Sequence, residues 1–142
     1  ASSIRCRIKN AGAQAANQDF LPLIAQLDGN NQIWITINGG NIQAYKKIAS
    51  ANTQVATAAY SANTHKWVRI RESGGTIYYD FSTDGSLWTN LGSVANPFAV
   101  TALQVGAAVG QFGAASATTC IIDKYNETDY VNRAFYTQQG YQ

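Results

Sequence analysis

Charged side chains are scarce in this chain, and it has no long apolar run. Asp, Glu, Lys and Arg make up 13% of its 142 residues, about half of the roughly 25% that is typical of globular domains. The net charge of +2 comes from ten basic and eight acidic residues. They are spread along the chain, which leaves no basic patch for a nucleic acid or an anionic membrane. No apolar stretch approaches the roughly 20 residues that cross a bilayer. We therefore expect neither nucleic-acid binding nor membrane insertion.

Residues that bind metal ions are almost as rare. The chain has one histidine and two cysteines. Cys6 and Cys120 belong to no C-x-x-C pair and no Cys/His cluster of the kind that binds zinc. The turn at residues 28–31 offers oxygen donors, but it lacks the clustered carboxylates that calcium prefers. We expect no metal ion and no other cofactor.

Catalytic motifs are missing as well. A retaining glycosidase needs two carboxyl groups about 5–5.5 Å apart, and no strand-like segment carries a pattern such as E-x-D-x-x-E. Asp84 is better explained as a turn residue that accepts hydrogen bonds from its own backbone. His65 is not accompanied by a G-x-S-x-G motif, and we expect it on the surface at the start of a strand. The sequence therefore predicts a protein without enzymatic activity.

The chain does contain a repeated alternation of apolar and polar residues. Residues 3–9 alternate apolar with basic side chains, and residues 32–38 place three isoleucines on one face and Trp34 on the other. This period of two is typical of half-buried β-strands, and turns rich in Asn and Gly separate the alternating segments. The predicted strands lie at residues 3–9, 20–27, 32–38, 41–48, 55–60, 67–72, 76–82, 87–91, 101–111 and 118–125.

Short strands joined by tight turns predict an all-β fold, a two-sheet antiparallel sandwich. A helix is the alternative for the Ala-rich segments at residues 11–16 and 56–62, but neither has an apolar stripe at helical spacing. We expect one domain over residues 1–129 and a polar, aromatic arm at residues 130–142 that a partner surface would order. The aromatic residues of this assembly arm are Tyr130, Phe135, Tyr136 and Tyr141.

One predicted hairpin carries the densest group of aromatic and charged side chains. The alternation turns Trp67, Arg69 and Arg71 outward from its first strand, and Tyr78 and Asp80 face the same side from its second strand. Aromatic rings stack on the apolar faces of sugars, while Arg and Asp groups hydrogen-bond hydroxyls. The same cross-strand pairs also stabilise an ordinary sheet without a ligand, by about 0.2–1 kcal/mol each. Both interpretations stay open.

The string H-x-W-x-R-I-R-E-x-G-G-T-x-Y-Y-D-x-S-x-D-G-x-x-W-T at residues 65–89 resembles the central segment of concanavalin A-like lectin/glucanase domains of the laminin-G-like kind. It is most similar to those in tail and receptor-binding proteins of bacterial viruses. Residues 105–106 and 122–125 also fit the closing strands of this family. The resemblance covers residues 3–126 and implies a jelly roll on an extracellular or virion surface, with carbohydrate bound on a concave sheet. The residues predicted to bind a saccharide or cell-surface glycan are Trp34, Tyr45, Trp67, Arg69, Arg71, Tyr78 and Asp80.

The resemblance leaves two structural questions open. The family usually has a strand before the one that begins at Ser3, so that strand is either lost or supplied by another chain. Because a free sheet edge accepts strands from a neighbour, the alternative to adhesion is a structural subunit of a virion or filament. Such a homo-oligomer would assemble by exchange of strands or of the arm. In this family the first and last strands lie side by side, so Cys6 and Cys120 are either bridged by a disulfide or present as two thiols.

Overall fold

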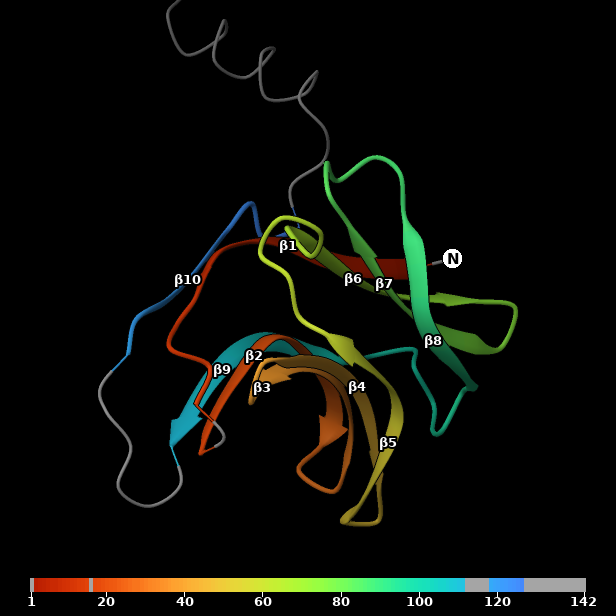
Figure 1. Ribbon diagram of the computed structural model, residues 1–142. Helices are drawn as coiled ribbons and strands as arrows, with labels where there is room; N and C mark the ends of the chain where they lie inside the picture. The colour runs from red at the N-terminus through yellow and green to blue at the C-terminus, as the bar shows by residue number, and fades with distance from the viewer. Residues whose placement is uncertain (1, 16, 112–117, 127–142) are drawn as a thin grey trace, which may run out of the picture.

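Ten β-strands make up the part of the chain that the structure describes, which is residues 2–15, 17–111 and 118–126. In this computed structural model the strands form two five-stranded antiparallel sheets that pack face to face (Figure 1). No helix within these residues is long and apolar enough to cross a membrane. The predicted all-β sandwich is confirmed. The predicted arm, with Tyr130, Phe135, Tyr136 and Tyr141, lies outside the described residues.

Each sheet contains strands from both halves of the chain. Sheet A has the order β10-β1-β6-β7-β8, and sheet B has the order β5-β4-β3-β2-β9. The strands of sheet A are β1 (Ser2–Ala11), β6 (Trp67–Ser73), β7 (Thr76–Ser82), β8 (Thr89–Ala95) and β10 (Cys120–Asp123). Those of sheet B are β2 (Gln18–Asp28), β3 (Asn31–Asn38), β4 (Asn41–Ile48), β5 (Ala51–Ala59) and β9 (Gln104–Gln111).

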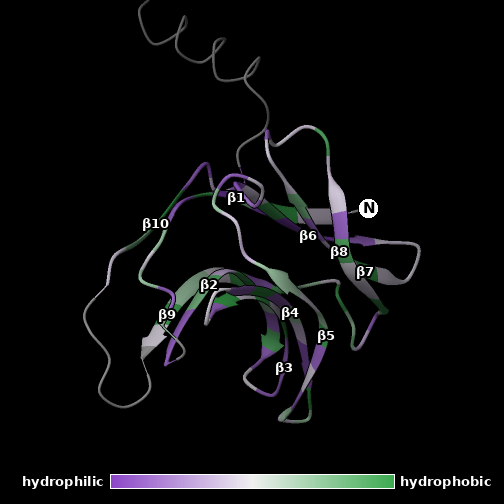
Figure 2. Cartoon of the chain, viewed as in Figure 1, coloured by the Kyte–Doolittle hydropathy of each residue, from purple (hydrophilic) through white to green (hydrophobic). Residues whose placement is uncertain are grey.

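The hydrophobic core lies between the two sheets. Alternate residues of the central strands enter it, so hydrophobic and hydrophilic bands follow one another along these strands (Figure 2). Hydrogen bonds also cross the core: the hydroxyl of Tyr79 in sheet A donates to the backbone carbonyl of Tyr45 in sheet B at 2.9 Å, and the thiol of Cys6 in sheet A donates to the backbone carbonyl of Pro22 in sheet B at 3.6 Å. The hydrophobic residues that are at most 3% exposed are Cys6, Leu23, Ala25, Ile33, Ile35, Ile37, Ile42, Ala44, Val68, Ile70, Ile77 and Tyr79.

Sheet B curves as an arch whose hollow face points away from sheet A (Figure 1). A bulge in β2 contributes to this shape, since Pro22 and Leu23 together stand opposite the single residue Ala107 of β9. An extra residue on one strand bends that strand and increases its local twist. The hollow side of sheet B is thus an outer surface, separate from the core.

β1 is an inner strand of sheet A, between β10 and β6. Arg7, for example, is paired with Asp123 on one side and with Trp67 on the other. The open edge expected beside the first strand is therefore wrong, because hydrogen bonds to β6 and β10 occupy both sides of β1. A strand from another chain has to add at a different edge of the sandwich.

His65 is buried, in the connection from sheet B to sheet A, and the surface position expected from the sequence is wrong. The residue is 4% exposed and lies between the rings of Tyr60 and Phe81, at centroid distances of 5.6 and 4.5 Å. Its Nδ1 accepts a hydrogen bond from the backbone N–H of Ser61 at 3.0 Å. Burial lowers the pKa of His65 by more than its contact with the Ser61 backbone raises it. Folding therefore favours the neutral form of this imidazole.

We expect the free energy of unfolding to increase as the pH rises from about 5 to 7.5. Because folding lowers the pKa of His65, the unfolded chain binds more protons than the folded chain as the pH falls past about 6.5. Stability is thus lost as the pH falls through the unfolded pKa. Urea unfolding at a series of pH values measures this dependence. His65→Gln removes the sole histidine and should flatten the slope, and an unchanged slope would contradict the assignment.

Candidate functional site

The residues predicted to bind carbohydrate lie on two opposite faces of the sandwich. Trp34 and Tyr45 are cross-strand partners on the outer face of sheet B. The others are carried by β6 and β7 of sheet A, on the side away from the core. The single combined surface predicted from the sequence is therefore wrong, because the core separates its two halves. The residues of the sheet A group are Trp67, Arg69, Arg71, Tyr78 and Asp80.

Asp80 is the centre of a hydrogen-bonded network on sheet A. Its Oδ2 accepts hydrogen bonds from Arg69 Nη2 at 2.8 Å, Arg69 Nε at 3.1 Å and Arg71 Nε at 2.8 Å. Its Oδ1 accepts one from Asn90 Nδ2 at 3.0 Å. Burial raises the pKa of Asp80, but the hydrogen bonds from Asn90, Arg69 and Arg71 outweigh it and leave the pKa below its ordinary value. The side chain is only 2% exposed, so this geometry does not favour the predicted contact with a sugar, which stays a prediction.

Arginines of sheet A lie against the aromatic rings on this side of the molecule. The guanidinium of Arg69 lies 4.2 Å from the ring centroid of Trp88, and that of Arg71 lies 3.9 Å from the ring centroid of Tyr78. An arginine of β1 lies 5.9 Å from the ring centroid of Trp67. Cation–π contacts of this kind contribute about 0.5–1 kcal/mol each at exposed sites. These contacts favour the interpretation of this face as cross-strand packing that stabilises the sheet.

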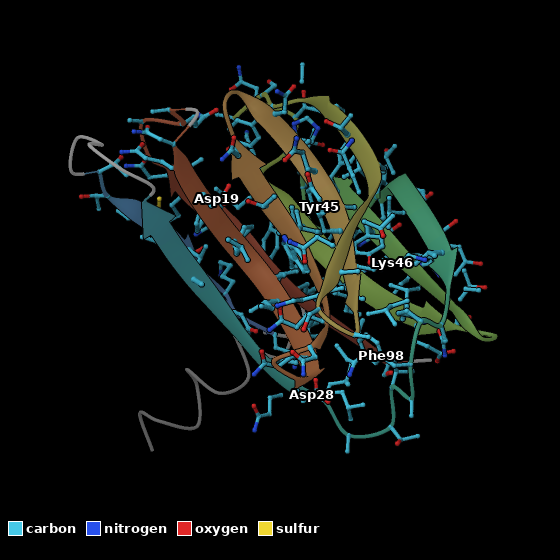
Figure 3. The ribbon with its side chains drawn as sticks, turned by 90° about the horizontal axis from the view of Figure 1, so that it is seen from below. Asp19, Asp28, Tyr45, Lys46 and Phe98 are labelled. Atoms are coloured by element: carbon cyan, nitrogen blue, oxygen red, sulfur yellow. The ribbon has the colours of Figure 1, made fainter. Side chains whose placement is uncertain are left out.

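An aromatic pair stands on the outer face of sheet B. The rings of Trp34 and Tyr45 are stacked, with their centroids 5.2 Å apart and their planes at 5°. Figure 3 looks onto this face, and Tyr45 lies near the middle of the sheet. The Tyr45 hydroxyl donates to Gln54 Oε1 at 3.1 Å, which fixes its ring against β5. Both residues are half-buried, so part of the apolar surface of their rings remains accessible.

A ladder of glutamine side chains crosses three strands beside the aromatic pair. Gln32 Nε2 donates to Gln26 Oε1 at 2.8 Å, and Gln26 Nε2 donates to Gln104 Oε1 at 3.1 Å. Each amide is thereby held by its neighbour at the roughly 4.8 Å spacing of the strands. A primary amide has two donor hydrogens and two acceptor lone pairs. The ladder therefore offers further hydrogen-bonding groups in a fixed arrangement.

On the other side of the aromatic pair, the outer face of sheet B carries polar side chains that are partly buried. Thr36 shares its face of β3 with Trp34, is 4% exposed, and its hydroxyl has no hydrogen-bond partner among the residues described. Beyond it, Asn38 donates to the carboxylate of Asp19 on β2. This side of the hollow face is therefore polar. The carboxylate of Asp19 on it is already hydrogen-bonded to Asn38.

The amide residues of this face were not predicted from the sequence. Gln32 lies two residues before Trp34, so the alternation alone could have placed both on one side of β3. Gln26 and Gln104 could not be found in this way, since their contact joins positions 78 residues apart. To place Gln26 and Gln104 beside Gln32, one has to know that β2 and β9 follow β3 in the order of sheet B.

The two cysteines are free thiols. β1 and β10 do lie side by side, but their register places Cys120 opposite Ala11, five residues along β1 from Cys6. At about 3.4 Å per residue this offset exceeds the roughly 7 Å between Cα atoms that a disulfide can bridge. Burial, with a smaller effect of the Asp123 charge, raises the pKa of Cys6 to about 12. Of the two alternatives, a disulfide and two thiols, the structure has the thiols.

No group of three or more His, Cys, Asp or Glu side chains that could hold a metal ion occurs within residues 2–15, 17–111 and 118–126. The rare carboxylates instead serve turns and ion pairs. Asp84 Oδ1 accepts hydrogen bonds from the backbone N–H groups of Ser86 and Leu87 at 2.8 and 3.0 Å, which confirms its predicted role in the turn.

Comparisons with known proteins bear on the fold alone. A solved crystal structure, described as that of a functionally unknown protein from Saccharomyces cerevisiae, is similar to this chain with a TM-score of 0.63 and 15% sequence identity. The similarity covers 87% of this chain and 66% of the yeast chain, just under two thirds of its length. No protein-family model and no curated protein matches the sequence. The similarity to the concanavalin A-like family therefore stays a prediction, while the two-sheet antiparallel β-sandwich is established.

Proposed function

We propose that this domain is a non-catalytic carbohydrate-binding or adhesion module whose ligand lies on the outer face of sheet B. The stacked pair of Trp34 and Tyr45 in the middle of that face carries the proposal. Aromatic surface beside well-placed hydrogen-bonding groups is the usual composition of a site for a polar ligand with apolar faces. The glutamine ladder and the Tyr45 hydroxyl supply such groups here.

The scarcity of charge at the aromatic pair favours a neutral saccharide. Sites for single-stranded nucleic acids combine stacking rings with a positively charged groove. Amides and hydroxyls are the main polar groups around Trp34 and Tyr45, and the cation on this face, Lys47 opposite Gln32, donates to the backbone carbonyl of Gly29 at 2.9 Å. The arginines of the chain that pair with Asp80 and Asp123 lie on the opposite sheet. A neutral ligand is bound by stacking and by hydrogen bonds to its hydroxyls, which matches the groups that sheet B presents.

We expect Trp34→Ala to weaken binding of a neutral saccharide at least tenfold, about 1.4 kcal/mol. The change removes the larger ring of the stacked pair and thereby apolar contact area for the ligand. A panel of neutral glucans, mannans and galactans would first be screened for binding, and isothermal titration calorimetry with the best of them would compare the variants. The matched control is Trp88→Ala, which removes a tryptophan from the β7–β8 connection, against Arg69 of the opposite sheet, and should leave the affinity unchanged.

The comparison of affinities requires that both variants are folded, which cooperative thermal unfolding of each would show. Equal affinities of Trp34→Ala and the wild type would place the ligand elsewhere. A loss on Trp88→Ala alone would move the site to the outer face of sheet A. If no member of the panel binds the wild-type protein, the proposed class of ligand is wrong.

A further inference from the structure

β9 is the outermost strand of sheet B, and its side chains are uncovered. Val105 and Val109 are 48% and 57% exposed, although their partners in β2 are the buried residues Ala25 and Phe20. They therefore point to the core side of the sheet, at its margin, where residues of sheet A cover them only in part. A cavity of about 240 Å³ opens beside Val109, lined by residues of β2, β3 and β9 of sheet B and of β1 and β10 of sheet A. An apolar stripe at the margin of the inner face of sheet B, formed by Val105 and Val109, is thus only partly covered by the described residues.

The free edge of β9 differs from the other outer edges of the two sheets. β5 and β8 each carry a bulge, at Val55 and Leu91 respectively. β10 has only four residues. Bulges and short strands are the usual protection of an edge against pairing with another chain. β9 has eight residues, no charged side chain and no proline, and the irregularity in its pairing with β2 lies on the β2 side. Its row of backbone groups is regular, and among the described residues a side chain hydrogen-bonds to it where the Tyr125 hydroxyl donates to the Gly106 carbonyl, at 3.4 Å.

We propose that β9 pairs antiparallel with β9 of a second copy of this chain, about a two-fold axis at Ala107. In this register Val105 lies opposite the partner's Val109, and Ala107 lies opposite its own counterpart. The residues 104–111, QVGAAVGQ, then bring together two valine–valine pairs and place no charge against another. A two-fold interface requires such a self-complementary surface. A second copy is therefore an occupant that fits this edge in side-chain size and in charge.

The pairing would join the two copies of sheet B into one sheet of ten strands, since each copy contributes five. A two-fold axis between antiparallel strands of one sheet is perpendicular to it, so both hollow faces would point the same way. The two Trp34 residues would lie five strand spacings apart, which is about 24 Å. If the proposed carbohydrate site is correct, a polysaccharide could contact both sites, and its second contact would be intramolecular. Only this consequence rests on the proposed function.

Symmetric cross-linking tests the register directly. Ala107→Cys and Ala108→Cys would each be made in a Cys120→Ser background and oxidised with copper phenanthroline. In the proposed dimer the two thiols introduced at position 107 face each other across the axis, within the reach of a disulfide. The two thiols introduced at position 108 are two residues out of register and about 8 Å apart, too far to be bridged. Both alanines are exposed, and Cys6 is fully buried, so the comparison is matched.

We expect Ala107→Cys to form a covalent dimer at least ten times faster than Ala108→Cys on non-reducing gels. Equal rates for the two variants would mean random collision and would overturn the register. Sedimentation equilibrium of the wild-type protein supplies the second test, which needs no variant. A protein that stays monomeric up to about 0.5 mM would overturn the dimer, because a pairing weaker than about 4–5 kcal/mol has no role at ordinary concentrations.

A charge in the stripe should separate the two copies. Val109→Lys brings a lysine against the partner's Val105 twice in each dimer, so the dissociation constant should rise at least tenfold. Leu87→Lys is the matched control, because Leu87 is an apolar residue that is 79% exposed on the β7–β8 connection. If both lysine variants weaken association equally, or neither does, the contact lies somewhere other than β9.

Discussion

Asp80→Ala is expected to lower the free energy of unfolding by about 3 kcal/mol, which is the cost of leaving the partners of a buried carboxylate without it. The carboxylate accepts four hydrogen bonds, from Arg69, Arg71 and Asn90. Removing it places two guanidinium groups side by side with no counter-charge. The arginine side chains are 21% and 31% exposed, so water relieves part of the cost. The value is therefore at the lower end of the range for buried pairs.

Asp123→Ala is the matched control for this experiment. Asp123 also forms a two-point contact with an arginine, Arg7, at 2.7 and 2.6 Å, but its side chain is 33% exposed. An exposed pair contributes about 0–1 kcal/mol. Urea unfolding of both variants would measure the difference. Similar losses in the free energy of unfolding for the two aspartates would show that burial of Asp80 does not increase its contribution to stability. The network on sheet A would then have to be reinterpreted.

Gly92→Ala is expected to cost about 2 kcal/mol, because the two sheets approach each other closely at this glycine. A methyl group at Gly92 in β8 would lie 2.6 Å from the Cβ of Ala56 in β5 and 3.6 Å from Val55 Cγ1. Real Cβ atoms do not come so close, so the edges of the sheets would have to move apart. Thermal unfolding followed by circular dichroism would report the loss.

The close approach can be tested by removing the other methyl group. Ala56→Gly alone should cost about 0.5–1 kcal/mol from backbone flexibility, but in the Gly92→Ala background it should restore stability. The double variant should therefore be more stable than Gly92→Ala, a non-additive result typical of residues in contact. Gly106→Ala is the control, since a methyl group there meets only Ile24 Cγ2 at 3.9 Å. Additive losses at positions 92 and 56 would contradict the proposed clash.

The strands could be predicted from the sequence because alternation is a local property. Each predicted strand has a counterpart in the structure, and the alternate spacing of Ile33, Ile35 and Ile37 correctly placed these residues in the core. The ends of strands were harder to predict. β8 begins at Thr89, two residues later than predicted, because the hydrogen bonds of Asp84 extend the preceding turn to Leu87.

The candidate site could not be predicted because alternation says that a side chain faces outward but not from which sheet. Trp34 and Trp67 have the same outward-facing pattern, yet β3 belongs to sheet B and β6 to sheet A. Assigning strands to sheets requires long-range pairing. The burial of Asp80 has a similar origin, since it depends on Asn90 in β8 and on both arginines of β6 closing over it.

The place of β1 and β10 in sheet A has a consequence for the order in which the molecule can be built. Arg7 and Asp123 are hydrogen-bonded across 116 residues, so sheet A is incomplete until most of the chain has left the ribosome. The hairpins β3–β4 and β6–β7 can form early, because their strands are neighbours in the sequence. Sheets completed by distant strands fold slowly, on the order of milliseconds to seconds. During synthesis the free side of β1 is therefore exposed to neighbouring chains, and chaperone protection would matter most before residue 123 emerges.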